Sequence, residues 1–413
     1  MKAQDSFDLI VIGGGAAGFF GAINAASNNP NLNILILEKT NKLLSKVRVS
    51  GGGRCNVTHH CFEPTPLSKH YPRGQRELKK LFRHFQAKDV VAWFGQRGVE
   101  LKTEEDGRMF PVTNQSETII DCFLSEAYRL NIKIEKNAEV INVKSENDGF
   151  SVLDSSQKIY QSKKVLIANG GVPKRSSYQW IVELGHSLVE PIPSLFTFND
   201  SLKKFKDLMG VSVENSTVQI AGTKFKETGP VLITHWGLSG PAVIKLSAWA
   251  AEYLFSRNYE FVALINWTGQ NSEDEVRDLL STYQMEHPKQ KIIGRALFGL
   301  PNRLWVRLCL LSEIDDAKIW GELPKKSLNR LIENLVRCEF RIKGKTTFKE
   351  EFVTCGGVRL DEIDLHTMES KIVPGVYFAG EVLDIDGETG GFNFQSAWTT
   401  AFVAAKAIAS AEG

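Results

Sequence analysis

The first forty residues alternate apolar runs with a segment of small side chains. Residues 7–12 form an apolar run of the length and composition expected of a strand that is buried on both faces. Small residues then predict a helix over about 16–27, which must end before Pro30 because proline cannot continue a helix. A second apolar run over 34–37 ends at Glu38. The pattern predicts a β-α-β unit.

An amphipathic helix is predicted over residues 75–97. Apolar side chains recur there at the spacing of one helix face, at Leu78, Leu81, Phe82 and Phe85. The opposite face is basic and carries Arg76, Lys79, Lys80, Arg83 and Lys88. We interpret this face as solvated, and a helix face that binds a polyanion stays open as the alternative.

The rest of the chain divides into segments that continue the first domain and an insert between them. Alternation over 132–168 predicts an antiparallel meander that ends in a buried strand at 165–168. Short β-like runs are then mixed with helices expected at about 272–287, 289–298, 301–311 and 325–337, and a last alanine-rich helix is expected over about 394–411. We predict a discontinuous first domain, 1–193 and 349–413, and an inserted domain, 194–348, that is part β and part helical.

Composition narrows the classes of function. The 413 residues carry 50 Lys and Arg against 48 Asp and Glu, a net charge of +2, which argues against a protein that binds nucleic acid by electrostatics. Six cysteines without a Cys-x-x-Cys pair and eight scattered histidines give no signal for a disulfide framework or a metal site. No segment reaches the ~18 apolar residues of a membrane span. We expect a soluble, cytoplasmic protein with a small-molecule substrate and neither a membrane nor a nucleic-acid partner.

A glycine-rich turn joins the first predicted strand to the first predicted helix. Gly13, Gly15 and Gly18 have the Gly-x-Gly-x-x-Gly spacing, and Glu38 closes the next strand 20 positions after Gly18. This is the full context of a dinucleotide fingerprint. Gly13 would form the tight turn, Gly15 would let a pyrophosphate approach the backbone, and Gly18 would let the helix pack on the strand. Glu38 could then accept hydrogen bonds from the ribose hydroxyls.

A second glycine-rich segment favours FAD over a dissociable NAD, and a third leads into the last helix. Residues 50–54 (Ser-Gly-Gly-Gly-Arg) offer backbone N–H groups and a guanidinium to phosphates or a ribityl chain. Residues 384–393 lead directly into the last helix. We expect the start of that helix to stabilise negative charge at N1 and C2=O of a reduced flavin ring.

Several motifs together resemble the BaiN-like family of NAD(P)/FAD-dependent oxidoreductases. They are residues 12–18 (Ile-Gly-Gly-Gly-Ala-Ala-Gly), 50–56 (Ser-Gly-Gly-Gly-Arg-Cys-Asn), 234–241 (Thr-His-Trp-Gly-Leu-Ser-Gly-Pro), 367–371 (Thr-Met-Glu-Ser-Lys), 378–387 (Phe-Ala-Gly-Glu-Val-Leu-Asp-Ile-Asp-Gly) and 389–395 (Thr-Gly-Gly-Phe-Asn-Phe-Gln). The resemblance covers essentially the whole chain. It implies an α/β fold in which a Rossmann-like, glutathione-reductase-type FAD-binding domain carries an inserted β-barrel with helices.

The resemblance also implies which residues hold FAD. The adenosine and pyrophosphate would lie on the glycine turn, on the residues that close the second strand and on the backbone of Val140. The second glycine loop would contact the phosphates or the ribityl chain, and the C-terminal segment would flank the ribityl chain and the ring. The implied cofactor residues are Gly13, Gly15, Ala16, Ala17, Gly18, Glu38, Lys39, Gly53, Arg54, Asn56, Val140, Gly380, Glu381, Asp384, Gly391, Phe392 and Asn393.

We predict that NAD(P)H reduces the flavin and that flavin N5 passes hydride to an organic acceptor. Because members of the resembled family act on unsaturated steroid-like acids, a conjugated C=C bond is the acceptor that the resemblance implies. No second fingerprint follows a strand in mid-chain, so NAD(P)H would bind only transiently. Three alternatives stay open: a flavoprotein that acts on RNA, a flavin-binding protein without turnover, and a disulfide reductase that uses Cys55 and Cys61.

The catalytic acid is not determined by the sequence. His59 and His60 follow the second glycine loop, and His235 lies in a Gly/Pro-flanked segment of the insert. Each is a hypothetical proton donor. The substrate, the choice between NADH and NADPH, and the oligomeric state are likewise not readable from the chain.

Overall fold

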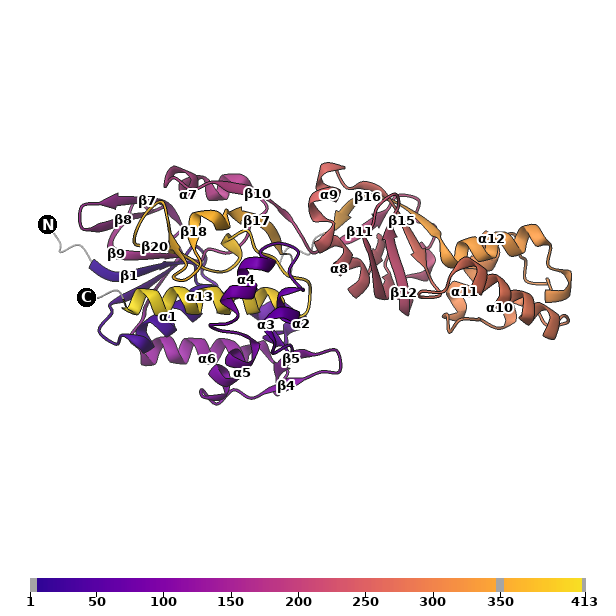
Figure 1. The fold of residues 1–413 in the computed structure, drawn as a ribbon, viewed down its shortest axis with the longest axis horizontal. Helices are drawn as coiled ribbons and strands as arrows, with labels where there is room; N and C mark the ends of the chain where they lie inside the picture. The colour runs from indigo at the N-terminus through magenta and orange to yellow at the C-terminus, as the bar shows by residue number, and fades with distance from the viewer. Residues whose placement is uncertain (1–5, 347–352, 411–413) are drawn as a thin grey trace. The chain divides into compact units, whose positions relative to one another are not determined.

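The computed structural model describes residues 6–346 and 353–410 (Figure 1). The chain forms two compact units. The first unit comprises Met1–Ser194 and Lys349–Gly413, and the second comprises Leu195–Phe348. Each unit has its own hydrophobic core.

The first unit is built on a parallel sheet. Its parallel strands lie in the order β20 (Val376–Phe378), β9 (Ile159–Ile167), β1 (Ser6–Ile12), β2 (Ile34–Glu38), β6 (Lys133–Lys136). The central strands contain buried apolar runs at Leu9–Ile12, Ile34–Leu37 and Val165–Ile167, as both faces of a parallel sheet require. Antiparallel strands extend the sheet: β7 (Val140–Glu146) and β8 (Gly149–Asp154) pair beside β9, while β18 (Ile363–Asp364) and β19 (Glu369–Ser370) continue from β20.

The first and last long helices of the first unit pack against each other. These are α1 (Ala16–Asn28) and α13 (Phe392–Ser410), which lie side by side in Figure 1. Gly21 of α1 lets this helix lie close to β9, because a Cβ there would be 2.6 Å from the Leu166 side chain, while Ala401 of α13 would be in ordinary contact at 3.8 Å. An aromatic cluster joins this pair to the helices α5 (Ala87–Gly95) and α6 (Ser116–Arg129) through Phe20, Trp93, Phe123 and Trp398.

Shorter elements complete the first unit. The helices are α2 (Ser45–Gly53), α3 (Pro64–Ser68), α4 (Gln75–Leu81) and α7 (Gln179–Glu183), with 3₁₀ turns at Arg175–Tyr178, Leu360–Glu362 and Gly380–Val382. A small antiparallel sheet has the order β3 (Thr58–His59), β5 (Arg108–Pro111), β4 (Leu101–Thr103), and β10 (Leu188–Pro193) pairs with β17 (Thr354–Val358).

The second unit contains a closed six-stranded barrel. Its strands close in the order β11 (Thr197–Asp200), β14 (Gly237–Ser239), β13 (Lys226–Ile233), β12 (Ser212–Ile220), β15 (Glu260–Asn266), β16 (Cys338–Thr346). Alternate residues of β16, Cys338, Phe340 and Ile342, are buried, as the two-residue period of a strand dictates. The helices are α8 (Pro241–Trp249), α9 (Ala251–Ser256), α10 (Glu273–Glu286), α11 (Asn302–Leu311) and α12 (Lys325–Val336), with 3₁₀ turns at Lys206–Leu208, Ile292–Gly294 and Trp320–Glu322. The predicted fold class, a Rossmann-like domain with an inserted barrel and helices, is confirmed.

Three local predictions were wrong. The single helix expected over 75–97 is two helices, α4 and α5, because Gln86 and Asp89 form a capping box that starts a new helix. The helix expected over 289–298 is only a 3₁₀ turn, Ile292–Gly294. β6 pairs in parallel with β2 rather than joining the antiparallel meander.

No helix among the described residues is long and apolar enough to cross a membrane.

Candidate functional site

The glycines of the turn between β1 and α1 serve two purposes. Some allow the backbone to pack closely, and one leaves open space for a ligand. Gly13 has φ +116°, and a Cβ there would be 2.3 Å from the carbonyl oxygen of Ala168. A Cβ at Gly18 would be 1.9 Å from the carbonyl oxygen of Gly13. Gly15 is different, since a Cβ there would meet no atom within 4 Å. The open space at Gly15, next to the start of α1, is where an anion can approach the helix N-terminus.

Glu38, at the end of β2, is fixed beside this turn. Its Oε2 accepts a hydrogen bond from the N–H of Gly14 at 2.9 Å, and its Oε1 accepts from the N–H and the hydroxyl of Thr40, both at 2.9 Å. A carboxylate oxygen can accept more than one hydrogen bond, so capacity remains for a ribose. Glu38 is thus held in place before any ligand binds.

A cavity of about 280 Å³ adjoins Glu38. Gly13, Glu38, Lys39 and Val140, all predicted cofactor residues, line it together with apolar residues such as Leu37 and Trp180. Asn169 also lines it, and its Oδ1 is buried without a hydrogen-bond partner among the described residues. A ligand that brings a hydrogen-bond donor would satisfy this atom. The mixed apolar and polar wall therefore fits the adenosine half of FAD.

The second glycine loop is strained in the way that only glycine tolerates well. α2 is interrupted at its end, where Gly51, Gly52 and Gly53 all have positive φ values, of 59°, 68° and 83°. Arg54, predicted to contact phosphates or the ribityl chain, already has partners: its Nη1 is 2.5 Å from Glu104 Oε1, and its guanidinium lies 4.0 Å from the Phe110 ring centre. A contact between Arg54 and FAD would compete with that ion pair.

Asn56 connects the second glycine loop to the start of α13. Oriented so that both ends of its amide are satisfied, Asn56 donates to the carbonyl oxygen of Thr58 (3.1 Å) and accepts from the N–H of Gly391 (3.0 Å). Gly391 must be glycine here, because a Cβ would be 2.6 Å from that same Thr58 oxygen. Residues far apart in the sequence thus meet at one helix start.

The C-terminal loop is held by its own polar side chains. Asn393 accepts from the N–H of Gly387 and donates to the Gly387 carbonyl, both at 2.8 Å. Asp386 is fully buried and forms an ion pair with Arg73, and the Ser194 hydroxyl also donates to it. The loop therefore has a defined shape where it enters α13.

Gly380 and Glu381 complete this end of the predicted cofactor site. The Gly380 N–H donates to the Thr400 hydroxyl at 2.9 Å, and a Cβ at Gly380 would be 2.8 Å from the Cβ of Ala17 in α1. Glu381 is 2.5 Å from Lys46 Nζ and accepts from the N–H of Thr354 at 2.8 Å. The turn at Gly380 thus lies directly against the first turn of α1.

A histidine and carboxylate pair beside α13 was missed by the sequence prediction. His70 Nδ1 lies 3.2 Å from Oε2 of Glu388, and the His70 ring stacks on Phe392 with ring centres 4.1 Å apart. The Glu388 side chain is only 5% exposed, so it orients the imidazole from a buried position. No sequence signal joins residues 318 positions apart.

The predicted proton donors differ in their surroundings. His59 stacks on Phe392, and its Nε2 is 3.0 Å from the Asp106 carbonyl oxygen. Burial lowers the pKa of His59, so a smaller fraction of this imidazole carries the extra proton near neutral pH than for an exposed histidine. His60 is exposed, and His235 is an exposed residue of the second unit, between β13 and β14.

The cysteines do not support a disulfide reductase. Cys55 and Cys61 are free thiols. Cys55 is fully buried, and burial raises its pKa to about 12. Burial also raises the pKa of Cys61. Because thiolates are the nucleophiles of disulfide exchange, both shifts oppose that alternative.

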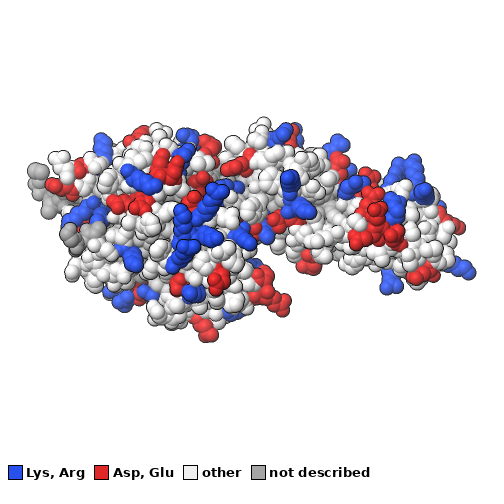
Figure 2. All heavy atoms as spheres, in the orientation of Figure 1, with Lys and Arg blue, Asp and Glu red and all other residues white. Residues whose placement is uncertain are grey.

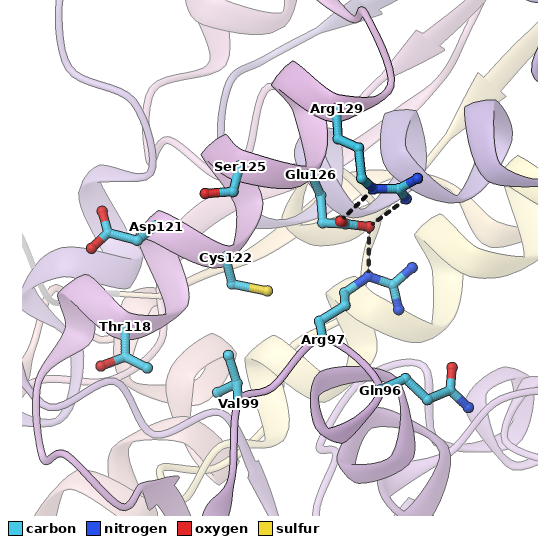
Figure 3. Close-up of a pocket in the computed structure, with 9 residues that line it drawn as sticks. All are labelled: Gln96, Arg97, Val99, Thr118, Asp121, Cys122, Ser125, Glu126 and Arg129. Atoms are coloured by element: carbon cyan, nitrogen blue, oxygen red, sulfur yellow. Dashed lines mark hydrogen bonds and ion pairs between the residues drawn. The ribbon is translucent and has the colours of Figure 1, made fainter.

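A hollow between α5 and α6 contains none of the predicted cofactor residues (Figure 3). It measures about 510 Å³ and is lined by Arg97, Cys122, Glu126 and Arg129 among others. Both arginines point to Glu126 and bind it, at 3.0 and 2.8 Å. Burial raises the pKa of Cys122 to about 11. The hollow therefore offers neither a free cation nor a reactive thiolate.

No group of three or more His, Cys, Asp or Glu side chains that could hold a metal ion occurs within residues 6–346 and 353–410.

Curated proteins similar to this chain match it over almost its full length. Ribosomal RNA dihydrouridine synthase from Haemophilus influenzae is 30% identical, covering 97% of this chain and 98% of that protein. The protein of the same name from Escherichia coli is 29% identical, covering 99% and 100%. The 3-dehydro-bile acid delta(4,6)-reductase of Clostridium scindens is 27% identical, covering 97% and 98%.

A solved structure and a family model agree with the fold described above. The 3-ketosteroid-delta4-(5alpha)-dehydrogenase of Rhodococcus jostii, in complex with 4-androstene-3,17-dione, matches with a TM-score of 0.53 at 14% identity, covering 99% of this chain and 98% of that one. At that identity the likeness shows the fold alone. The model of the HI0933-like protein Rossmann domain matches residues 7–407. The resemblance read from the motifs is confirmed, and the chain belongs to the HI0933-like Rossmann family of flavin-dependent oxidoreductases.

Proposed function

We propose that the chain is an FAD-dependent reductase of a carbon–carbon double bond conjugated to a carbonyl, and that its substrate is a uridine in RNA. One observation carries the proposal: the names of the three relatives that match over nearly their full length all describe reduction of a double bond of this type. In uridine the C5=C6 bond is conjugated to the C4 carbonyl, and saturating it gives dihydrouridine. In a 3-keto steroid the Δ4 bond is conjugated to the C3 carbonyl.

The RNA substrate departs from the expectation drawn from net charge. A net charge of +2 describes the whole chain and says nothing about how the charges are arranged. Two of the three relatives above, including the one with the highest identity of the three, carry the RNA name. Those names favour RNA over the steroid-like acid.

Different parts of the site would hold different parts of FAD. The glycine turn, Glu38 and the 280 Å³ cavity would hold the adenosine and pyrophosphate of FAD. The loop before α13 would flank the ring. When bound, FAD supplies a reduced ring that can give hydride to the β-carbon of the conjugated bond. We propose NAD(P)H as the transient reductant.

His70 is the proposed proton donor for the α-carbon. Its Nδ1 faces the buried Glu388, which leaves Nε2 as the nitrogen that can exchange a proton with a substrate. The stacked Phe392 ring restricts the rotation of the imidazole. Both partners adjoin the segment that enters α13.

The test is the nucleoside content of RNA. Ribosomal RNA from cells lacking the protein would be incubated with the purified holoprotein and NADH or NADPH, then digested and examined by mass spectrometry. We expect one or more uridines to gain two hydrogens. Unchanged RNA, together with reduction of a 3-keto-Δ4 steroid acid, would establish the second candidate function, a steroid-like acid reductase, which the similarity to the Clostridium scindens enzyme favours.

A further inference from the structure

The helix α4 presents a row of cations that form no ion pair with any residue the structure describes. Leu78 and Leu81 of α4 and the following Phe82 are buried in the core, at 0–1% exposure. The opposite side carries the α4 basic row, defined as Arg76, Lys79, Lys80 and Arg83. These positions follow the spacing i, i+3, i+4, i+7, which places them on one helix face. Arg83 belongs to the turn that continues α4, where its N–H donates to the Lys80 carbonyl.

None of these four cations forms an ion pair within residues 6–346 and 353–410. Other exposed arginines of the first unit behave differently: Arg48 pairs with Glu117, Arg175 with Glu190 and Arg359 with Asp361. Glu77, the carboxylate of α4, lines a hollow with residues 360–366 instead. Figure 2 shows Lys and Arg side chains gathered over α4. The row is therefore charge without a partner in the described chain.

The row begins beside the loop that enters α13. Arg73, three residues before Arg76, is bound to the buried Asp386. A Cβ at Gly74 would be 2.6 Å from the side chain of Ile385, so the start of α4 is packed against residues 384–386. That loop is part of the proposed flavin site. A substrate that reaches the flavin side of this loop can continue along α4.

The chemistry of α4 fits RNA better than a membrane. A helix that binds a lipid surface needs exposed apolar side chains to insert, but the apolar face of α4 is buried in the core. Phosphates need only positive charge at suitable spacing. From Arg76 to Arg83 the row spans about 10 Å at 1.5 Å per residue, enough to face roughly three phosphates of a strand.

We propose that the α4 basic row binds the phosphate backbone of the RNA whose uridine enters the flavin site. The inference rests on the proposed function, because it takes RNA as the substrate. The sequence left two interpretations of this basic helix face open, a solvated surface and a polyanion-binding site. The proposal favours the second. The row would supply affinity and orientation without reading the base.

The test compares two charge-matched variants of the full-length holoprotein. One carries Lys79→Gln and Lys80→Gln; the control carries Lys144→Gln and Lys406→Gln, two exposed lysines of the same unit with no ion pair among the described residues. Binding of a fluorescein-labelled RNA hairpin with a uridine-rich loop is followed by anisotropy over a range of KCl concentrations. A third variant neutralises all four residues of the row.

The salt dependence gives the expected magnitude. For every phosphate that a cation of the row no longer neutralises, the slope of log K against log[KCl] becomes shallower by about 0.7. We expect the slope to become shallower by about 1.4 in the double variant and, because the row faces roughly three phosphates, by about 2.1 in the quadruple variant, with the control unchanged. Flavin content and the rate of flavin reduction by NAD(P)H should stay at wild-type values in all variants.

The outcomes separate this inference from the proposed function. Uridine reduction by the quadruple variant with wild-type KM and salt slope would overturn the role of the row and leave the function standing. Tight RNA binding through the row without uridine reduction would support the row and refute the function. Loss of binding to phosphatidylglycerol vesicles, with RNA binding intact, would overturn the inference in favour of a lipid surface.

Discussion

Replacing Gly15 with alanine should separate cofactor binding from folding. Gly15 precedes α1 with φ −97° and ψ −168°, angles that alanine adopts without strain, and its Cβ would meet no atom within 4 Å. Loss of glycine at the helix N-cap costs about 0.5–1 kcal/mol, and restriction of the unfolded chain offsets this by about 0.4–1 kcal/mol. The free energy of unfolding of the apoprotein should stay within about 1 kcal/mol of wild type.

Affinity for FAD should change far more. The added methyl group would occupy the open space through which we propose that the pyrophosphate approaches the N–H groups of the turn. One hydrogen bond to a charged group is worth about 1.5–3 kcal/mol, so its loss predicts a Kd for FAD about 10- to 150-fold higher. Isothermal titration of the apoprotein with FAD measures this directly, and thermal unfolding of the same sample measures stability.

Gly13→Ala is the contrasting variant. Its φ of +116° and a Cβ 2.3 Å from the Ala168 carbonyl oxygen predict a loss of stability even without FAD. A wild-type Kd for FAD in Gly15→Ala would mean that the open side of the turn does not face the pyrophosphate.

Further substitutions test the other parts of the site. Glu38→Ala should raise the Kd for FAD about tenfold or more by removing the proposed ribose acceptor; equal affinity by titration would contradict its role. Asp386→Ala should destabilise the protein by about 3–5 kcal/mol, because Arg73 is left without its buried partner. Urea unfolding measures this change, and a loss under about 1 kcal/mol would mean that the Arg73 charge is solvated without Asp386. His70→Asn should lower kcat about 100-fold or more at unchanged flavin content, whereas an unchanged kcat would remove His70 as the proton donor. Burial lowers the pKa of His59 in the folded protein, so on acidification the unfolded chain binds a proton at this imidazole before the folded protein does. The contribution of His59 to stability is therefore present above about pH 6.5 and is lost as the pH falls. The urea midpoint should fall less steeply on acidification in His59→Asn than in wild type, and parallel curves for the two proteins would count against this.

Local patterns in the sequence predicted the local structure well. The β-α-β unit and its glycine turn depend on residues within a span of about forty, so the strand, the turn and the helix are all encoded by neighbours. The split between α4 and α5 was missed because apolar periodicity continues through the break. Gln86 and Asp89 form the capping box that decides it, and their side-chain bonds are not visible in the periodicity.

The centre of the site could not be predicted in the same way. Arg73 meets Asp386 across 313 positions, and His70 meets Glu388 across 318, so no spacing rule connects them. Asn56 was predicted to contact the cofactor near the phosphates or ribityl chain, and the structure gives its amide partners within the protein at Thr58 and Gly391. Such contacts exist only once the loop before α13 has folded against the first half of the chain.

A single-turnover experiment can show whether the reduced flavin passes its hydride to uridine in RNA. The holoprotein is reduced anaerobically with a limiting amount of NADPH or NADH, mixed with ribosomal RNA, and followed by flavin absorbance while dihydrouridine is counted. We expect oxidised flavin to return in the same molar amount as dihydrouridine forms. A flavin that stays reduced in the presence of RNA, while a 3-keto-Δ4 steroid acid reoxidises it, would contradict the RNA assignment.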